Sequence, residues 1–202
     1  MHTAVTSTVL RTHGLQVQVD GARVLHNVSV DILEGTCTAL LGPNGSGKTT
    51  FLRAVLGLMP SAGVVTWFGQ HEQDYRATQR VSLVPQMLPA VNAVPVSVSE
   101  FVESAFSSPR SRFSRWRGRG REQRAAAVDA ALARVDLSAK AHRTVDALSG
   151  GEQRRALFAR AIVTGADVIL MDEPLAGVDV EHQEHLVGIL QTMLESGATL
   201  VI

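Results

Sequence analysis

Residues 42–50 read Gly-Pro-Asn-Gly-Ser-Gly-Lys-Thr-Thr, so a lysine and two hydroxyls follow a glycine-rich turn. This matches the pattern of a glycine, four residues and Gly-Lys-Thr that is typical of phosphate-binding loops. Glycines let backbone N–H groups turn towards a polyanion, and a following helix adds its positive end. We expect Lys48 to reach the β- and γ-phosphates of ATP and the Thr49 hydroxyl to ligate Mg²⁺. The expected nucleotide-binding residues are Gly42, Pro43, Asn44, Gly45, Ser46, Gly47, Lys48, Thr49 and Thr50.

An ordinary glycine-rich turn is the alternative explanation for this segment. The turn lies between an apolar run at residues 36–41, expected to be a strand, and an expected helix at residues 48–58. That position favours the phosphate loop.

Two acids follow another apolar run, Val-Ile-Leu-Met at residues 168–171. Open parallel sheets bind ligands at the carboxyl ends of their strands, where Asp172 and Glu173 would lie. We expect Asp172 to hold the magnesium and Glu173 to act as the general base that polarises the attacking water. A solvated strand end with two surface acids is the alternative, and the phosphate loop makes it less attractive.

A second glycine turn, Leu-Ser-Gly-Gly-Glu-Gln, occupies residues 148–153. Ser149 is a good helix N-cap, and Glu152 stands three residues later, as in a capping box. Local physics therefore predicts a capped helix start. The adjacent glycines Gly150 and Gly151 would also expose N–H groups to an anion.

The surrounding elements alternate between strands and helices. Apolar runs predict strands at residues 9–19, 24–33, 36–41, 64–68, 81–84, 167–171 and from 198. Helices are expected at residues 48–58, 97–106, 122–135, from 151, and 180–195. The first two strands should form a β-hairpin, and the later alternation predicts a largely parallel sheet. The mostly helical middle of the chain looks like an insertion into this α/β core.

Composition limits the other function classes. The 202 residues are 45% hydrophobic, and the charged residues balance to a net charge of zero, which gives no general case for nucleic-acid binding. A single cysteine, Cys37, excludes an internal disulfide and is expected to be buried in the core. No apolar stretch reaches the roughly 18–20 residues of a membrane span. We therefore expect any membrane association to come through a partner.

Residues 148–153 resemble the signature motif of ATP-binding cassette (ABC) ATPases. Together with residues 42–49 and the Asp-Glu pair, the resemblance runs from about residue 15 to the end of the chain. It implies a P-loop NTPase core with an N-terminal antiparallel β subdomain (about 1–86 and 150–202) and a helical subdomain (about 87–149). It also implies a dimer in which Ser149, Gly150, Gly151 and Glu152 cap the γ-phosphate held by the other chain.

Two further segments match this family. Gln86 resembles the glutamine that touches Mg²⁺ and the attacking water and senses the membrane subunit; a polar loop residue is the alternative. Residues 175–179 resemble the loop through which the two ATPases contact each other. Asp179 could also be the N-cap of the following helix.

Two family features are missing. Val19 occupies the position that usually stacks an aromatic ring on adenine, so base contact should be weaker there. The family places a switch histidine a few residues after a strand like that at residues 198–202, where this sequence stops. We expect a C-terminal truncation, and a chain that binds Mg-ATP but hydrolyses it poorly.

The resemblance implies an ATPase subunit that powers a transporter from the cytoplasmic face of the membrane. Its partners would be a second ATPase subunit, transmembrane permease subunits and, indirectly, a substrate-binding protein. Residues 84–86, 95–106 and 115–117 are loosely similar to the zinc/manganese import group. Importers of siderophores, haem or vitamins are the alternative, as is a soluble ABC ATPase outside transport.

Two other features are interpreted as solvated surface. Seven arginines lie between Arg110 and Arg124, with Phe113 and Trp116 among them. RNA or anionic lipid could bind such a stretch, but a solvated loop is favoured. His182 and His185 do not have the spacing of a His-Glu-x-x-His metal site.

Overall fold

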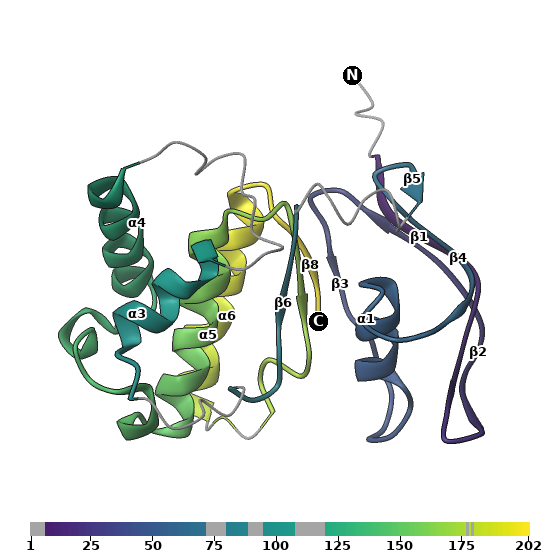
Figure 1. Ribbon diagram of the computed structural model, residues 1–202, viewed down its shortest axis with the longest axis horizontal. Helices are drawn as coiled ribbons and strands as arrows, with labels where there is room; N and C mark the ends of the chain where they lie inside the picture. The colour runs from purple at the N-terminus through teal and green to yellow at the C-terminus, as the bar shows by residue number, and fades with distance from the viewer. Residues whose placement is uncertain (1–6, 72–79, 89–94, 108–119, 177, 179) are drawn as a thin grey trace.

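The computed structural model describes residues 7–71, 80–88, 95–107, 120–176, 178 and 180–202, and of Val180–His182 the backbone alone. An antiparallel sheet opens the chain, with the strand order β2-β1-β4-β5 (Figure 1). Its strands are β1 (Thr8–Val19), β2 (Ala22–Leu33), β4 (Ala62–Trp67) and β5 (Gln70–His71). The predicted hairpin is confirmed. Asp20 and Gly21 form its turn with φ of 50° and 80°, as a tight hairpin of this twist requires.

The second sheet is parallel, as predicted, with the strand order β3-β8-β7-β6. Its strands are β3 (Cys37–Thr38), β8 (Thr199–Val201), β7 (Val168–Met171) and β6 (Val81–Val84). The prediction of a buried strand at residues 36–41 is wrong in two respects. The strand is shorter, and Cys37 is exposed rather than buried, because β3 lies at the edge of the sheet.

The parallel sheet separates two hydrophobic cores. Val168 and Leu170 of β7 face the antiparallel sheet and α1 (Lys48–Val55), whereas Ile169 and Met171 face the other core. That second core includes α5 (Gly150–Thr164) and α6 (Val180–Glu195). The alternation follows from the two-residue period of a strand. Helices α1 and α5 therefore lie on opposite faces of this sheet (Figure 1).

Helix α1 is held against the antiparallel sheet and ends early. The buried indole of Trp67 donates a hydrogen bond of 2.8 Å to the Val55 carbonyl. The helix was expected to continue to residue 58, but Gly57, with φ of 60°, follows its last turn. A glycine in this conformation commonly ends a helix.

The described part of the middle of the chain is mostly helical, as predicted. It contains α3 (Val98–Glu103), η1 (Ser104–Ser107), α4 (Arg121–Arg134), η3 (Ser138–Lys140) and η4 (Val145–Ala147). Val128 and Leu132 of α4 are buried in the same core as Leu157 of α5. The helical segment is thus packed directly onto the helix that begins at the second glycine turn.

Some expectations fall outside the described residues, namely those on Asp179, on the side chain of His182 and on the arginines between 110 and 119. Among the described residues, no helix is long and apolar enough to cross a membrane. In the same part of the chain, no cluster of three or more His, Cys, Asp or Glu side chains could hold a metal ion.

Candidate functional site

The loop between β3 and α1 is bent around its own lysine. The Lys48 Nζ donates hydrogen bonds to the carbonyl oxygens of Gly42 at 2.8 Å and Pro43 at 3.2 Å. Gly47 has φ of 96°, and a Cβ there would lie 2.8 Å from a methyl group of Leu25. Glycine is therefore required at Gly47 both by its backbone conformation and by the close approach of the hairpin.

Asp172 and Thr49 meet although 123 residues separate them. The Thr49 hydroxyl donates a hydrogen bond of 2.9 Å to Asp172 Oδ1. Asp172 is buried and directly follows β7, and its N–H donates to the Val84 carbonyl at the end of β6. A hydroxyl and a carboxylate are the hard oxygen ligands that Mg²⁺ prefers. This donor pair fits the magnesium of a bound nucleotide.

Glu173 lies between Lys48 and Gln86. Its Oε1 is 3.3 Å from Lys48 Nζ, and its Oε2 accepts a hydrogen bond of 3.0 Å from Gln86 Nε2. The backbone of Glu173 has φ of 50°, a left-handed conformation that costs a non-glycine residue free energy. Such strain concentrates at functional sites, and here it occurs at the residue expected to be the base.

The structure thus brings together the phosphate loop, the acid pair and Gln86 at the carboxyl ends of the parallel strands. Val19 lies at the end of β1 beside the hairpin turn, where it is 39% exposed. The same hairpin approaches the phosphate loop at Gly47 through Val24 and Leu25.

The second glycine turn forms the predicted capping box. Ser149 caps α5 by accepting from the Glu152 N–H, while the Glu152 carboxylate accepts from the Ser149 N–H at 3.0 Å. Lys140, which sequence reasoning missed, pairs with the other Glu152 oxygen. The ion pair and the capping bond lower the pKa of Glu152 to about 2. Lys140 and Lys48 are the only two lysines of the chain. This rarity could have marked Lys140 as a residue with a specific role.

The lowered pKa of Glu152 predicts an acid-dependent loss of stability. Glu152 carries its charge in the folded chain down to a pKa of about 2, against an ordinary value of 4.5. Its contribution is therefore fully present above about pH 4.5 and is lost as the pH falls towards 2. For this partly exposed pair we expect about 0.5–1 kcal/mol.

Urea unfolding of the parent and of Glu152→Gln between pH 6 and 3 measures this effect. The difference in unfolding free energy should shrink as the pH falls. Glu122→Gln, at the start of α4 but outside any capping box, is the matched control and should show no such trend. A constant difference for Glu152→Gln across the range would contradict the prediction.

Sequence reasoning also missed Arg154, one turn into α5. Its guanidinium donates to four main-chain carbonyls, those of Gln86, Glu173, Pro174 and Ala176. Burial lowers the pKa of Arg154, and the Glu173 carboxylate opposes this shift. Nothing in the sequence separated Arg154 from the other sixteen arginines, because its function depends on loops that are distant in the chain.

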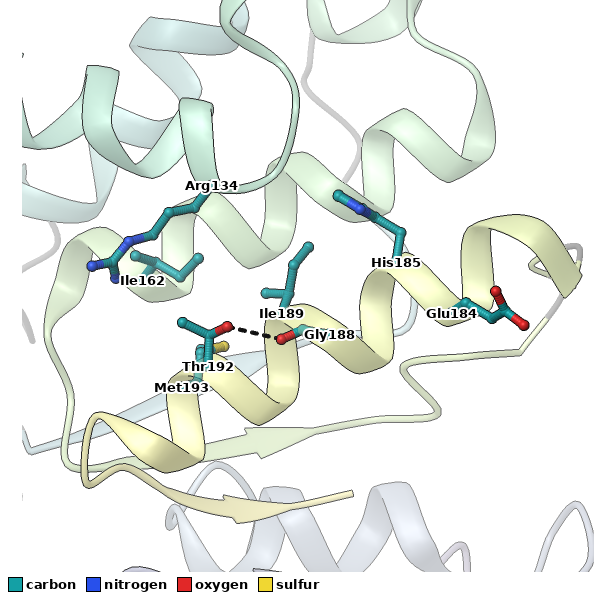
Figure 2. Close-up of a pocket in the computed structure, with 8 residues that line it drawn as sticks. All are labelled: Arg134, Ile162, Glu184, His185, Gly188, Ile189, Thr192 and Met193. Atoms are coloured by element: carbon teal, nitrogen blue, oxygen red, sulfur yellow. Dashed lines mark hydrogen bonds between the residues drawn. The ribbon is translucent and has the colours of Figure 1, made fainter.

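A separate pocket of about 430 Å³ lies among α4, α5 and α6. Figure 2 shows residues that line it, among them Ile162, Ile189, Arg134 and His185. The site residues predicted from the sequence lie elsewhere, so this pocket belongs to a different part of the molecule.

A phosphate loop after one parallel strand, with an acid pair at the end of another strand of the same sheet, defines a P-loop nucleotide hydrolase. Comparison with known proteins identifies one family within this class. The sequence profile of the ABC transporter family matches residues 25–176. The chain therefore belongs to the ABC transporter family, and it is an ATP-hydrolysing subunit of the kind this family contains.

Individual relatives agree with this assignment. The zinc uptake system ATP-binding protein ZurA of Listeria monocytogenes is 33% identical over 176 residues, which cover 86% of this chain and 67% of the relative. The cobalamin import ATP-binding protein BtuD of Halobacterium salinarum is 36% identical over 193 residues, or 94% and 46% of the two chains. The fold is similar to the ADP conformation of MJ1267, an ATP-binding cassette of an ABC transporter. That likeness has a TM-score of 0.79 at 23% identity and covers 98% and 81% of the two chains.

Proposed function

We propose that this chain binds and hydrolyses Mg-ATP to drive the import of a divalent metal ion, zinc or manganese. The observation that carries the hydrolytic part is the meeting of Thr49 with Asp172 and of Lys48 with Glu173. These pairs join the predicted phosphate loop to the predicted acid pair across the sheet. A surface strand end with two unrelated acids would have no reason to make these contacts.

The proposed roles follow from the donor chemistry of each group. Lys48 and the loop amides neutralise the phosphates, while Thr49 and Asp172 hold Mg²⁺, which supplies charge stabilisation in phosphoryl transfer. Glu173 accepts a proton from the attacking water. Gln86 donates a hydrogen bond to Glu173, so in this proposal it orients that carboxylate and responds to a membrane partner.

The second glycine turn supports a dimer of two such subunits. Ser149, Gly150 and Gly151 start α5, on the opposite face of the sheet from α1 and its phosphate loop. A second copy would let this turn reach a phosphate that its own chain does not present to it. In this proposal ATP closes the pair, and hydrolysis releases it. The motion would be passed to permease subunits, which hold the chain at the cytoplasmic face of the membrane.

Similarity to a zinc uptake ATPase over 86% of the chain supports a metal as the substrate. Cobalamin import is the alternative that the second relative favours. The substrate would pass through the permease, so transport by whole cells is the appropriate measurement.

Disruption of the gene in its host should lower the uptake of radioactive zinc or manganese at least about fivefold. Uptake of cobalamin and haemin should remain at the parental level. The parental gene should restore metal uptake, and a Lys48→Ala copy should not. Loss of cobalamin or haemin uptake with normal metal uptake would overturn the metal assignment.

A further inference from the structure

We propose that Arg154 is a positioning residue that couples the signature turn to the catalytic loops of the same chain. The inference rests on the proposed roles of Glu173, Gln86 and the turn at the start of α5. Arg154 would make these three segments respond as one unit when a phosphate reaches the turn.

The contacts of Arg154 all go to the backbone of the catalytic loops. Nη1 donates to the carbonyls of Glu173 at 3.1 Å, Pro174 at 3.0 Å and Ala176 at 2.6 Å. Nη2 donates to the Gln86 carbonyl at 3.0 Å. One guanidinium therefore joins the segment after β6 to the loop after β7. Since it binds main-chain atoms, it fixes where these loops lie whatever their side chains do.

The choice of arginine fits this role. A guanidinium is a rigid planar fork that stays charged even when burial lowers its pKa. Among the described residues, its hydrogen bonds go to carbonyl oxygens rather than to a carboxylate. Desolvating a charge for neutral acceptors is a costly way to stabilise a fold. The arrangement is better explained by the need to hold two loops in register.

If Arg154 were lost, little direct packing would hold the catalytic loops against the start of α5. A pocket of about 230 Å³ lies beside it, bordered by Gln86, Leu88, Gly150, Gln153 and Ala176. The loops and the start of α5 thus surround a solvent-accessible hollow instead of closing on one another. Arg154 follows Gly150 by one helical turn, and a helix transmits displacement along its axis. A shift of the signature turn would therefore reach Glu173 through this side chain.

Arg154→Met and Arg154→Lys test the coupling in the 202-residue chain. The Met variant should lower the single-turnover hydrolysis rate at least about tenfold and leave the Kd for Mg-ATP within about twofold. The hydrolysis rate of the Lys variant should lie between those of the parent and the Met variant, because one ammonium cannot bind both loops. Arg134→Met, which removes an exposed arginine from α4, is the matched control and should behave like the parent.

Hydrogen exchange gives a second measurement that does not depend on turnover. The Ala176 N–H is bonded to the Glu173 carbonyl, and the Asp172 N–H is bonded to the Val84 carbonyl. Arg154→Met should speed exchange of the Ala176 N–H. Exchange of the Asp172 N–H and of the amides of α5 should stay at the parental rate. Parental exchange at Ala176, or faster exchange throughout α5, would overturn the coupling role. If the parent chain failed to bind Mg-ATP, the proposed function would be refuted. The exchange result would still report whether Arg154 holds the loops, because it does not depend on turnover.

Discussion

Replacement of Lys48 by alanine should abolish measurable nucleotide binding. Lys48 holds two carbonyls of the phosphate loop and lies 3.3 Å from Glu173, so it is the cation at the centre of the predicted site. Its loss removes a positive charge that would face the phosphates. It also leaves the negative charge of Glu173 unpaired near the phosphates. Charge-assisted contacts of this kind contribute several kcal/mol in combination. Calorimetric titration with Mg-ATP should show at least about a 100-fold rise in Kd.

Arg53→Ala is the matched control for that experiment. Arg53 is an exposed cation near the end of the same helix, α1. Its removal changes the net charge by the same amount and should leave the Kd for Mg-ATP within about twofold. Both variants should unfold at nearly the parental temperature. Parental affinity in Lys48→Ala would remove the role assigned to the loop.

The sequence predicted the parts of the site that depend on local patterns. The glycines of the phosphate loop, the acids at the end of β7 and the capping box at Ser149 each follow from short-range rules. Because parallel strands end at one edge of a sheet, the meeting of the loop with the acid pair was also foreseeable. The hairpin and the parallel sheet followed from turn residues and apolar runs in the same way.

Features that depend on tertiary position could not be predicted. Cys37 belongs to a segment predicted to be a buried strand, yet it is exposed because its strand lies at the sheet edge. Arg154 binds carbonyls 19 to 22 residues ahead of it and 68 residues behind it. No periodicity marks such contacts, because a main-chain carbonyl carries no residue identity. The pairing of Lys140 with Glu152 is likewise visible only once α5 and η3 are packed together.

The left-handed backbone of Glu173 was also hidden from the sequence, and it bears on mechanism. A residue strained at φ of 50° must be held by its surroundings. Arg154 binds the Glu173 carbonyl, while Lys48 and Gln86 bind its carboxylate. These three contacts restrain both the backbone and the side chain. A preorganised base of this kind needs little rearrangement at the moment of reaction.

Glu173→Gln should therefore abolish hydrolysis and keep nucleotide binding. The amide has nearly the shape of the carboxylate, and its oxygen can still accept from Gln86, but it cannot take a proton from water. Loss of a general base lowers a rate by about 100-fold or more. Because a negative charge near the phosphates is removed, the affinity for Mg-ATP should be unchanged or higher. Single-turnover assays and calorimetry measure the two effects separately.

The same variant should accumulate the ATP-closed pair of subunits, because the bound nucleotide is no longer consumed. Size-exclusion chromatography in Mg-ATP should show a dimer that disappears when ADP replaces ATP. Glu195→Gln, an exposed acid at the end of α6, is the matched control and should hydrolyse ATP at the parental rate. If Glu173→Gln also hydrolysed at that rate, the base would have to be another group. A variant that neither hydrolysed nor bound ATP would instead show that Glu173 supports the loop through Lys48.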